Sequence, residues 1–511
     1  MAISRGRSYS ISGIQALPIT VEVDIRRGLP SYTTVGLPDK AISESKNRIT
    51  AAIKNSGYDF PVKKITVNLA PADIKKEGSA FDFPIALSIL SATGIIKKKR
   101  LDNIGCVGEL SLDGSLRRIC GALPIALKMK DEGIKEIILP IESSKEAGIV
   151  EGIKVIPVSN LRQAVDYLNN DLNIDPLTVD IKKEYTKKIS YRMDFSDIKG
   201  QYFARRALEI AAAGGHNVLM IGPPGSGKTM LAKRMVTILP PLSVQEAIEV
   251  TMIYSVSGSL RQGTTLHTIR PFRSPHHTIS DVALVGGGSI PKPGEITLAH
   301  RGVLFLDEFP EFKRSVIEVI RQPLEDRKIT VSRALDTVTF PAGFMLIAAM
   351  NSCPCGYTGV PNKNCLCSSE QIRKYRNKIS GPIMDRIDMH IEVPRVKRKE
   401  LIKMAQGEDS DTIRRRVIKA RSKQSLRFIN DENIFCNADM DAKAVEKYCI
   451  LENDALNILS RGVDSYGFSA REYNKVIKIA QTIKDLDNQD KINAQHIAEA
   501  IQYRVIHNDV F

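Results

Sequence analysis

The clearest chemical signal in the sequence is a glycine-rich stretch that fits the pattern G-x-x-x-x-G-K-[ST] at every fixed position: Gly222, Pro223, Pro224, Gly225, Ser226, Gly227, Lys228 and Thr229. Backbone N–H groups of such a loop surround phosphates, Lys228 reaches the β and γ phosphates, and the Thr229 hydroxyl binds Mg²⁺. An apolar strand-like segment precedes the loop, and a segment with helical spacing follows it. The spacing therefore predicts a site for ATP and Mg²⁺ between a strand and a helix.

Two later apolar segments also end in polar residues. Residues 303–306 are followed by Asp307 and Glu308, and residues 344–350 by Asn351. We expect Asp307 to hold Mg²⁺, mostly through water, and Glu308 to polarise the attacking water. Asn351 fits a sensor that orients this water. A single strand with a polar end is more often structural, but this order after a phosphate loop predicts ATP hydrolysis.

The rest of the chain must supply the elements that position these residues. Residues 1–170 contain segments of strict alternation, such as 19–25, together with helical segments, and predict an α/β domain. The polar, Lys-rich stretch 171–194 suits a linker. Residues 195–396 hold the nucleotide motifs, and the periodicity within 397–511 predicts helices.

Length and charge narrow the class of protein. A chain of 511 residues should form two to four domains, and its formal net charge of +15 favours a polyanionic partner such as nucleic acid. A solvated, Lys-rich surface is the alternative explanation. No segment has the length and apolarity of a signal peptide or a membrane helix, so we expect a cytoplasmic protein that does not act at a membrane.

Four of the eight cysteines form two C-x-C pairs with nine residues between them: Cys353, Cys355, Cys365 and Cys367. Disulfides are rare in cytoplasmic proteins, so such a cluster is judged as a metal site or as packing. Two close pairs across a loop can surround one Zn²⁺, although structural zinc sites usually have the wider C-x₂₋₄-C spacing. We predict a structural zinc, with buried or free thiols as the alternative.

The first domain resembles the Lon-protease-like fold, which raises the question of a Ser/Lys catalytic dyad. At the position of the nucleophilic Ser this chain has Ala80, with Ser79 one position early. At the position of the Lys, after a Gly-Gly pair in that family, the chain runs Cys120-Gly121-Ala122-Leu123-Pro124. The resemblance therefore implies a scaffold or ring-building role rather than proteolysis.

The second domain resembles AAA+ ATPases, and further site residues follow from that resemblance. In this class the Ile-x-Gly-Gln element, here Ile198 and Gly200 with Gln201, lines the adenine pocket. The segment 381–388 resembles the arginine-finger segment of ring ATPases, which implies that Arg386 enters the neighbouring subunit's site; an ion pair within the same subunit is the alternative. Arg471 stands where a second sensor would reach the γ-phosphate.

We therefore expect an α/β protein in which a Lon-protease-like domain precedes an AAA+ P-loop ATPase core with a C-terminal helical lid. The runs 270–277, 293–302 and 469–471 look like the magnesium-chelatase-like AAA+ proteins, and Val35 to Lys40 narrows the resemblance to the YifB/ComM branch. That branch implies an ATP-driven, homohexameric DNA helicase. It promotes branch migration in homologous recombination, notably of DNA taken up in natural transformation, and recombination proteins are potential partners.

Two rival functions come from the same superfamily. One is a motor subunit that drives metal insertion into a porphyrin, but such subunits resemble only the central and C-terminal parts of this chain and lack the cysteine cluster. The other is an ATP-dependent protease or unfoldase, which the missing dyad weakens.

DNA contacts in a ring motor must sit on loops that move with the nucleotide state. Two stretches between the phosphate loop and Asn351 qualify: the insert 270–292 and the alternating stretch 327–333, which predicts a hairpin strand. Both stretches have a structural alternative, with the histidines packed against the core. The expected DNA contacts are Arg273, His277, Lys292, Lys328 and Arg333.

Overall fold

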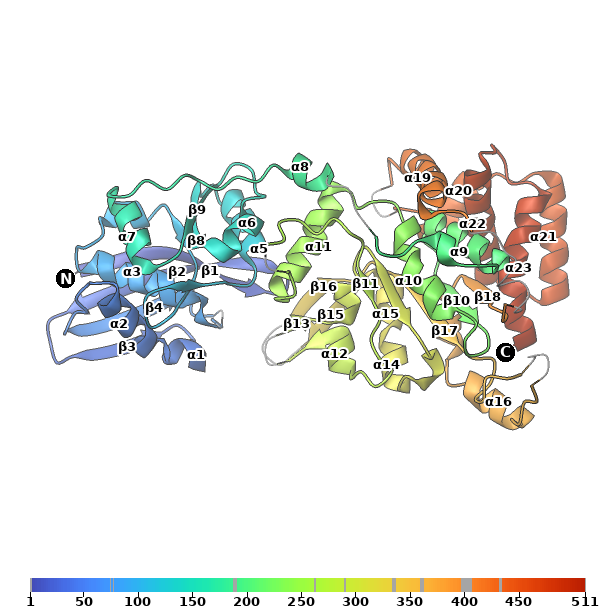
Figure 1. Ribbon diagram of the computed structural model, residues 1–511, viewed down its shortest axis with the longest axis horizontal. Coiled ribbons are helices and arrows are strands. Elements are labelled where there is room, and N and C mark those ends of the chain that lie inside the picture. The colour runs from blue at the N-terminus through green and yellow to red at the C-terminus, as the bar shows by residue number, and fades with distance from the viewer. Residues whose placement is uncertain are drawn as a thin grey trace. The chain divides into compact units, whose positions relative to one another are not determined.

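The computed structural model describes residues 2–73, 75–76, 78–186, 191–261, 263–288, 291–332, 337–358, 363–396, 407–431 and 434–510. The chain divides into two compact units (Figure 1). Unit 1 comprises Met1–Lys188 and Val244–Thr268, and unit 2 comprises Ile189–Ser243 and Ile269–Phe511.

Unit 1 is built on a seven-stranded mixed sheet in the order β3-β4-β2-β1-β5-β8-β9. The strands are β1 (Ala2–Ser12), β2 (Gln15–Arg26), β3 (Ser31–Val35), β4 (Lys64–Ala70), β5 (Gly105–Cys106), β8 (Glu136–Pro140) and β9 (Lys154–Val158). Strands β1, β2 and β4 pair antiparallel, and the other pairs are parallel. The predicted strand 19–25 is part of β2, whose alternate residues are buried.

Helix α3 (Asp82–Ala92) packs against β1 and β2 of this sheet, and all of its residues are buried. The other elements are α1 (Lys40–Ser43), α2 (Ser45–Asn55), η1 (Ser79–Phe81), α4 (Lys98–Leu101), the hairpin of β6 (Glu109–Leu110) and β7 (Leu116–Arg117), α5 (Ala122–Asp131), α6 (Ile141–Ala147), α7 (Leu161–Asn169) and α8 (Ile181–Thr186).

Helix α11 (Val244–Val256) belongs to unit 1, although its sequence follows the phosphate-loop helix of unit 2. It packs on α5. The Gly121 amide donates to Ser255 Oγ at 3.0 Å, and an Arg118 guanidinium nitrogen donates to the Leu260 carbonyl at 2.8 Å. The compact units therefore divide the chain differently from the expected domain limits, which place 244–268 in the ATPase core.

Unit 2 is built on a parallel five-stranded sheet in the order β11-β14-β17-β10-β18. Its strands are β11 (Phe272–Arg273), β14 (Val303–Leu306), β17 (Met345–Met350), β10 (Val218–Ile221) and β18 (Met389–Glu392). All residues of β10, β14 and β17 are buried, as expected for a parallel sheet covered on both faces. A parallel sheet with the glycine-rich loop at the carboxyl end of β10 is consistent with the predicted P-loop ATPase core.

Helices α9 (Tyr202–Gly214) and α10 (Lys228–Ile238) share one hydrophobic core with this sheet. The smaller elements of the unit are η2 (Phe195–Asp197), α12 (Asp281–Val285), β12 (Gly286–Gly287), β13 (Lys292–Pro293), α13 (Glu295–Leu298), η3 (Phe309–Glu311), α14 (Arg314–Val319), α15 (Arg321–Asp326), β15 (Lys328–Ser332), β16 (Thr337–Pro341), α16 (Ser369–Arg376) and α17 (Gly381–Met384). Strands β15 and β16 pair antiparallel, which confirms the predicted hairpin.

The C-terminal part is helical, as predicted, and Figure 1 shows its helices gathered together in orange and red. They are α19 (Ser410–Arg427), η4 (Asn437–Asp439), α20 (Ala442–Tyr448), α21 (Asn453–Tyr466), α22 (Ala470–Asp487) and α23 (Ala494–Val510). Ser469 and Glu472 form a capping box that starts α22, so Arg471 lies in its first turn. Among the described residues, none of the helices combines the length and apolarity required to span a bilayer.

Candidate nucleotide site

The phosphate loop joins β10 to α10, as the sequence predicts. Gly227 adopts a left-handed conformation (φ 94°) and α10 begins at Lys228, so the loop lies at a helix N-terminus of partial positive charge. The Lys228 ammonium donates to the carbonyls of Gly222 (2.7 Å) and Pro223 (3.0 Å) and to Asn351 Oδ1 (3.2 Å). Burial lowers the pKa of Lys228, and the nearby Asp307 and Glu308 carboxylates oppose this shift.

The Mg²⁺ ligands expected from the sequence lie together. The Thr229 hydroxyl donates to Asp307 Oδ2 at 2.6 Å, although 78 residues separate them. A cavity of about 490 Å³ is lined by Pro224, Gly225, Ser226, Gly227, Lys228, Thr229, Met230, Asp307, Glu308, Met350 and Asn351. Hydroxyl and carboxylate oxygens are ligands suited to Mg²⁺, and the cavity is large enough for a triphosphate tail.

A second cavity, of about 420 Å³, adjoins the first and shares Gly225, Ser226, Gly227 and Met230 with it. Ile198, Lys199, Gln201, Arg395 and Val396 line it too. The Gln201 side-chain amide donates to the carbonyls of Ser226 (3.2 Å) and Pro394 (2.5 Å), so it ties the phosphate loop to the end of β18. The adenine is therefore expected beside Ile198, whereas Gly200 lines a separate cavity with Tyr202 and Arg205.

The two arginines expected to act on the γ-phosphate have acidic neighbours. Arg386, whose side chain is 9 % exposed, forms an ion pair with Glu325, the within-subunit alternative raised from the sequence. Burial and the neighbouring Arg321 and Arg471 lower the pKa of Arg386. Arg471 is 70 % exposed and lies 3.7 Å from Asp385.

The lid helices hold the segment that carries Arg386. Lys475 of α22 donates to the Ile387 carbonyl at 3.0 Å, and Arg504 of α23 donates to the same carbonyl at 2.8 Å. Movement of the lid would therefore move Arg386 as well.

The residues expected to contact DNA are spread over several environments. Arg273 is paired with both oxygens of Glu295 at 2.6 Å, and His277 Nδ1 lies 3.3 Å from Glu308 Oε2. Lys292 in β13 and Lys328 at the start of β15 are exposed. Arg333 lies outside the described residues.

The contact between His277 and Glu308 was not foreseen from the sequence. The His277 ring lies 4.1 Å from the His276 ring and meets the edge of Phe312 at 6.4 Å, measured between ring centroids. This places an imidazole on the carboxylate expected to activate water. Residues 31 positions apart carry no spacing signal for such a contact.

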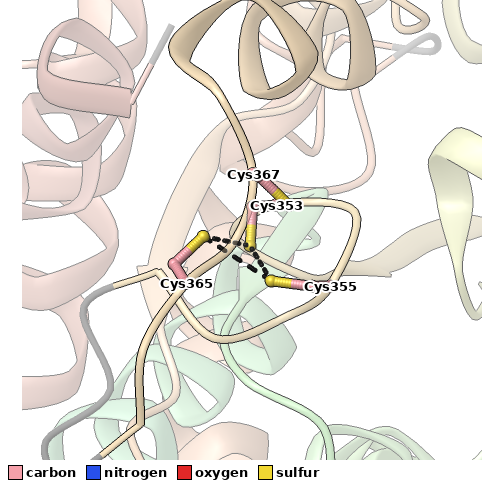
Figure 2. A group of neighbouring side chains, drawn as sticks. All are labelled: Cys353, Cys355, Cys365 and Cys367. Carbon is pink, nitrogen blue, oxygen red and sulfur yellow. Dashed lines mark hydrogen bonds between the residues drawn. The ribbon is translucent and has the colours of Figure 1, made fainter.

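The four clustered cysteines converge, as Figure 2 shows, with their sulfur atoms all within 4.8 Å of one another. Cys353 Sγ lies 3.4 Å from Cys355 Sγ and 3.6 Å from Cys365 Sγ. Tetrahedral Zn²⁺ with Zn–S bonds of about 2.3 Å requires S···S separations of about 3.8 Å, so the arrangement fits zinc. Burial raises the pKa of Cys353, but hydrogen bonds from Thr358 and from Cys355 and Cys365 outweigh it and lower that pKa to about 6.

Comparison with known protein families agrees with this geometry. Residues 194–401 match the family model described as magnesium chelatase, subunit ChlI; residues 21–143 match subunit ChlI of Mg-chelatase, and residues 407–504 match the C-terminal part of the same subunit. All three models describe the same chelatase subunit. The match over residues 21–143 therefore contradicts the expectation that such subunits resemble only the central and C-terminal parts of this chain.

Individual proteins similar to this chain show to which branch of the magnesium-chelatase-like family it belongs. YifB of Salmonella typhimurium is 42 % identical over 509 residues, and the competence protein ComM of Haemophilus influenzae is 41 % identical over 512; each match covers 99 % of this chain and 98 % of the relative. Lon protease 2 of Bacillus subtilis is 30 % identical over 139 residues, which is 26 % of this chain and 24 % of that protein. The chain belongs to the YifB/ComM branch of the magnesium-chelatase-like family.

Proposed function

We propose that this chain is an ATP-driven DNA translocase that assembles as a homohexamer and promotes branch migration during homologous recombination. The observation that carries the proposal is the convergence of Lys228, Thr229, Asp307 and Asn351 beside a cavity of triphosphate size. In the mechanism, Lys228 leaves the loop carbonyls for the β and γ phosphates. Asp307 and Thr229 would hold Mg²⁺, which would neutralise negative charge on the phosphates, and Glu308 takes the proton of the attacking water.

Assembly is proposed because the described lining of the phosphate cavity has no arginine to stabilise the charge that develops on the γ-phosphate. Among the described residues that line the phosphate cavity, Lys228 is the one cation. Arg386 from a neighbouring subunit would complete the site by exchanging its ion pair with Glu325 for the γ-phosphate. Arg471 of the lid would approach the same phosphate.

Two observations support DNA as the substrate: the net charge of the chain and its similarity to ComM. The net charge of +15 suits a polyanion, and the full-length relative ComM is named a competence protein. The proposed phosphate contacts are the exposed Lys328 at the start of β15, the exposed Lys292 of β13, and Arg333, which follows β15 in the sequence. We also propose Zn²⁺ as the resident metal of the four cysteines, which elemental analysis would detect as about one zinc per chain.

ATP hydrolysis measured with and without DNA tests the function. We expect branched or single-stranded DNA to stimulate hydrolysis, and ATP to drive displacement of a strand from a synthetic four-way junction. Removing Lys328 and Arg333 together should weaken binding to every DNA sequence alike. It should also flatten the slope of log K against log[salt] by about 0.7–0.9 per lost contact.

Other outcomes separate the rival functions. Hydrolysis that DNA leaves unchanged would contradict the proposal and favour a chelatase-type motor. ATP-dependent breakdown of an unfolded protein substrate would favour a protease.

A further inference from the structure

The cysteine cluster lies next to the nucleotide site, both in the sequence and in the structure. Cys353 is two residues beyond Asn351, and Cys353 to Gly356 form a tight turn in which the Gly356 amide donates to the Cys353 carbonyl at 2.9 Å. Thr358 completes the turn, because its amide donates to Cys353 Sγ at 3.4 Å. The position of this turn is therefore tied to the position of the four sulfur atoms.

The turn packs against the phosphate loop at Gly356. A Cβ atom at this position would lie 2.5 Å from Pro224 Cδ and 3.7 Å from Asn351 Cγ. The backbone also has φ of +78°, a conformation that favours glycine. Gly356 is thus in van der Waals contact with a residue of the phosphate loop, and no other residue type fits there without displacing Pro224.

A second connection runs through Asn351 itself. The residues flanking the cluster are held by α16. Arg376 donates to the Ser352 carbonyl at 3.3 Å, and the buried Tyr375 hydroxyl accepts from the backbone N–H of Asn351. Asn351 Oδ1 in turn accepts from Lys228. Both Pro224 and Lys228 are consequently positioned by the loop that carries the thiols.

The thiols cannot hold this arrangement as anions without a cation. Four thiolates with sulfur atoms within 4.8 Å of one another would repel strongly, and a divalent metal ion removes that repulsion. Loss of the metal would release the turn, and Gly356 and Asn351 with it.

We propose that Zn²⁺ bound by Cys353, Cys355, Cys365 and Cys367 acts as a clamp on the ATP site, setting the positions of Pro224 and Asn351. Zinc occupancy then controls nucleotide binding and hydrolysis. This inference rests on the proposed ATPase function, but it assigns the cysteine loop a role in the nucleotide site that a purely structural zinc would not have.

Two kinds of variant test the clamp in the full-length protein. Cys355→Ser with Cys367→Ser should lose zinc, and Gly356→Ala should keep about one zinc per chain while its new Cβ displaces Pro224. In both we expect ATP turnover to fall ~100-fold, the scale of a misplaced catalytic group, and binding of a fluorescent ADP analogue without Mg²⁺ to weaken ~10-fold. Cys120→Ser, at an exposed thiol outside the cluster, is the matched control and should change neither quantity.

Reversible removal of the metal from the wild-type protein tests the clamp even if the cysteine variants fail to fold. Wild-type protein stripped of zinc by a chelator should bind the ADP analogue ~10-fold more weakly and recover on addition of Zn²⁺ alone. Zinc-free protein with wild-type analogue binding and turnover would overturn the clamp, as would wild-type protein purified with no zinc. Zinc-dependent analogue binding in a protein without ATP turnover would instead support the clamp and contradict the proposed ATPase.

Discussion

Two helices of this molecule begin in the same way and lead to different chemistry. In unit 2, α10 follows Gly227, and in unit 1, α5 follows Gly121. Both glycines adopt the left-handed backbone conformation, with φ of 94° and 81°. The first residue of α10 is Lys228, and its helix start opens on a cavity. The first residue of α5 is Ala122, and the Gly121 amide already donates to Ser255 Oγ of α11.

The difference shows that a helix N-terminus can bind a ligand only if suitable side chains lie beside it and no other part of the chain already fills its donors. The start of α10 has an ammonium, a hydroxyl and two nearby carboxylates, and no chain segment fills its cavity among the residues described. In unit 1, the Ser79 hydroxyl donates to the Glu109 carboxylate, and Ser255 of the chain itself occupies the start of α5. We therefore expect chemistry in unit 2 and a structural role for unit 1.

The largest expected effect comes from removing the chemistry of unit 2. Lys228→Ala should abolish tight ATP binding, and Glu308→Gln should bind ATP but turn it over at least ~100-fold more slowly, because a positioned base is lost. Nucleotide titration and phosphate release measure the two effects. Ser79→Ala in unit 1 is the control and should leave both unchanged; near-normal turnover in the two unit 2 variants would remove the basis of the comparison.

Arg386→Ala tests whether the open site is completed by another subunit. We expect nucleotide binding to be kept and hydrolysis to fall by ~10³-fold or more, the scale of an arginine finger. Mixing this variant with Glu308→Gln should restore part of the activity wherever an intact Glu308 meets an intact Arg386. Full activity of a strictly monomeric Arg386→Ala protein would contradict a site shared between subunits.

His277→Ala should have a smaller effect on the same site. The imidazole competes with water for the Glu308 carboxylate, so its removal should raise turnover without DNA by about 2- to 5-fold, the scale of a weak, partly exposed contact. His276→Ala is the matched control, because that ring lies next to His277 but contacts Thr278 instead of Glu308. Equal turnover in the wild type and both variants would show that the contact has no role in hydrolysis.

The smallest effect concerns the stability of unit 1. Burial raises the pKa of Glu146 to about 7, and the Ser255 hydroxyl and Arg118 oppose that shift. The folded state therefore keeps a proton on Glu146 that the unfolded state releases near pH 4.5. The protonated carboxyl contributes fully to the free energy of unfolding below that pH, and the contribution is lost as the pH rises through about 7. Glu146→Gln should raise the melting temperature at pH 8 by about 2–4 °C and have little effect at pH 4.5.

The exposed Glu142 on the same helix provides the control for that measurement. Glu142→Gln should leave the melting temperature unchanged at both pH values. A Glu146→Gln gain that is equal at pH 4.5 and pH 8 would show that the buried carboxyl does not titrate as described.

Local patterns predicted the elements that carry the nucleotide motifs. The strand, loop and helix around Lys228, the buried strands before Asp307 and Asn351, the β15–β16 hairpin and the capped start of α22 all follow from periodicity and turn residues. These features depend on neighbours within a few residues. The motif spacing also identified residues that meet in space, such as Thr229 and Asp307.

Contacts between distant residues could not be predicted in this way. The apolar face of α11 indicates that the helix is buried, but its periodicity does not specify which core it joins. The pairs His277 with Glu308 and Arg386 with Glu325 depend on the packing of several elements, and single-sequence spacing has no signal for them. The cysteine spacing indicated a metal site but not its contact with Pro224.

The placement of α11 has a consequence for synthesis of the chain. Unit 1 includes residues up to Thr268, so it lacks α11 when Lys188 leaves the ribosome, and the next 80 residues include the phosphate loop. At about 5–20 residues per second, translation of that stretch takes roughly 4–16 s. During that interval the surface of α5 that α11 will cover is exposed, which makes the nascent chain more prone to aggregate.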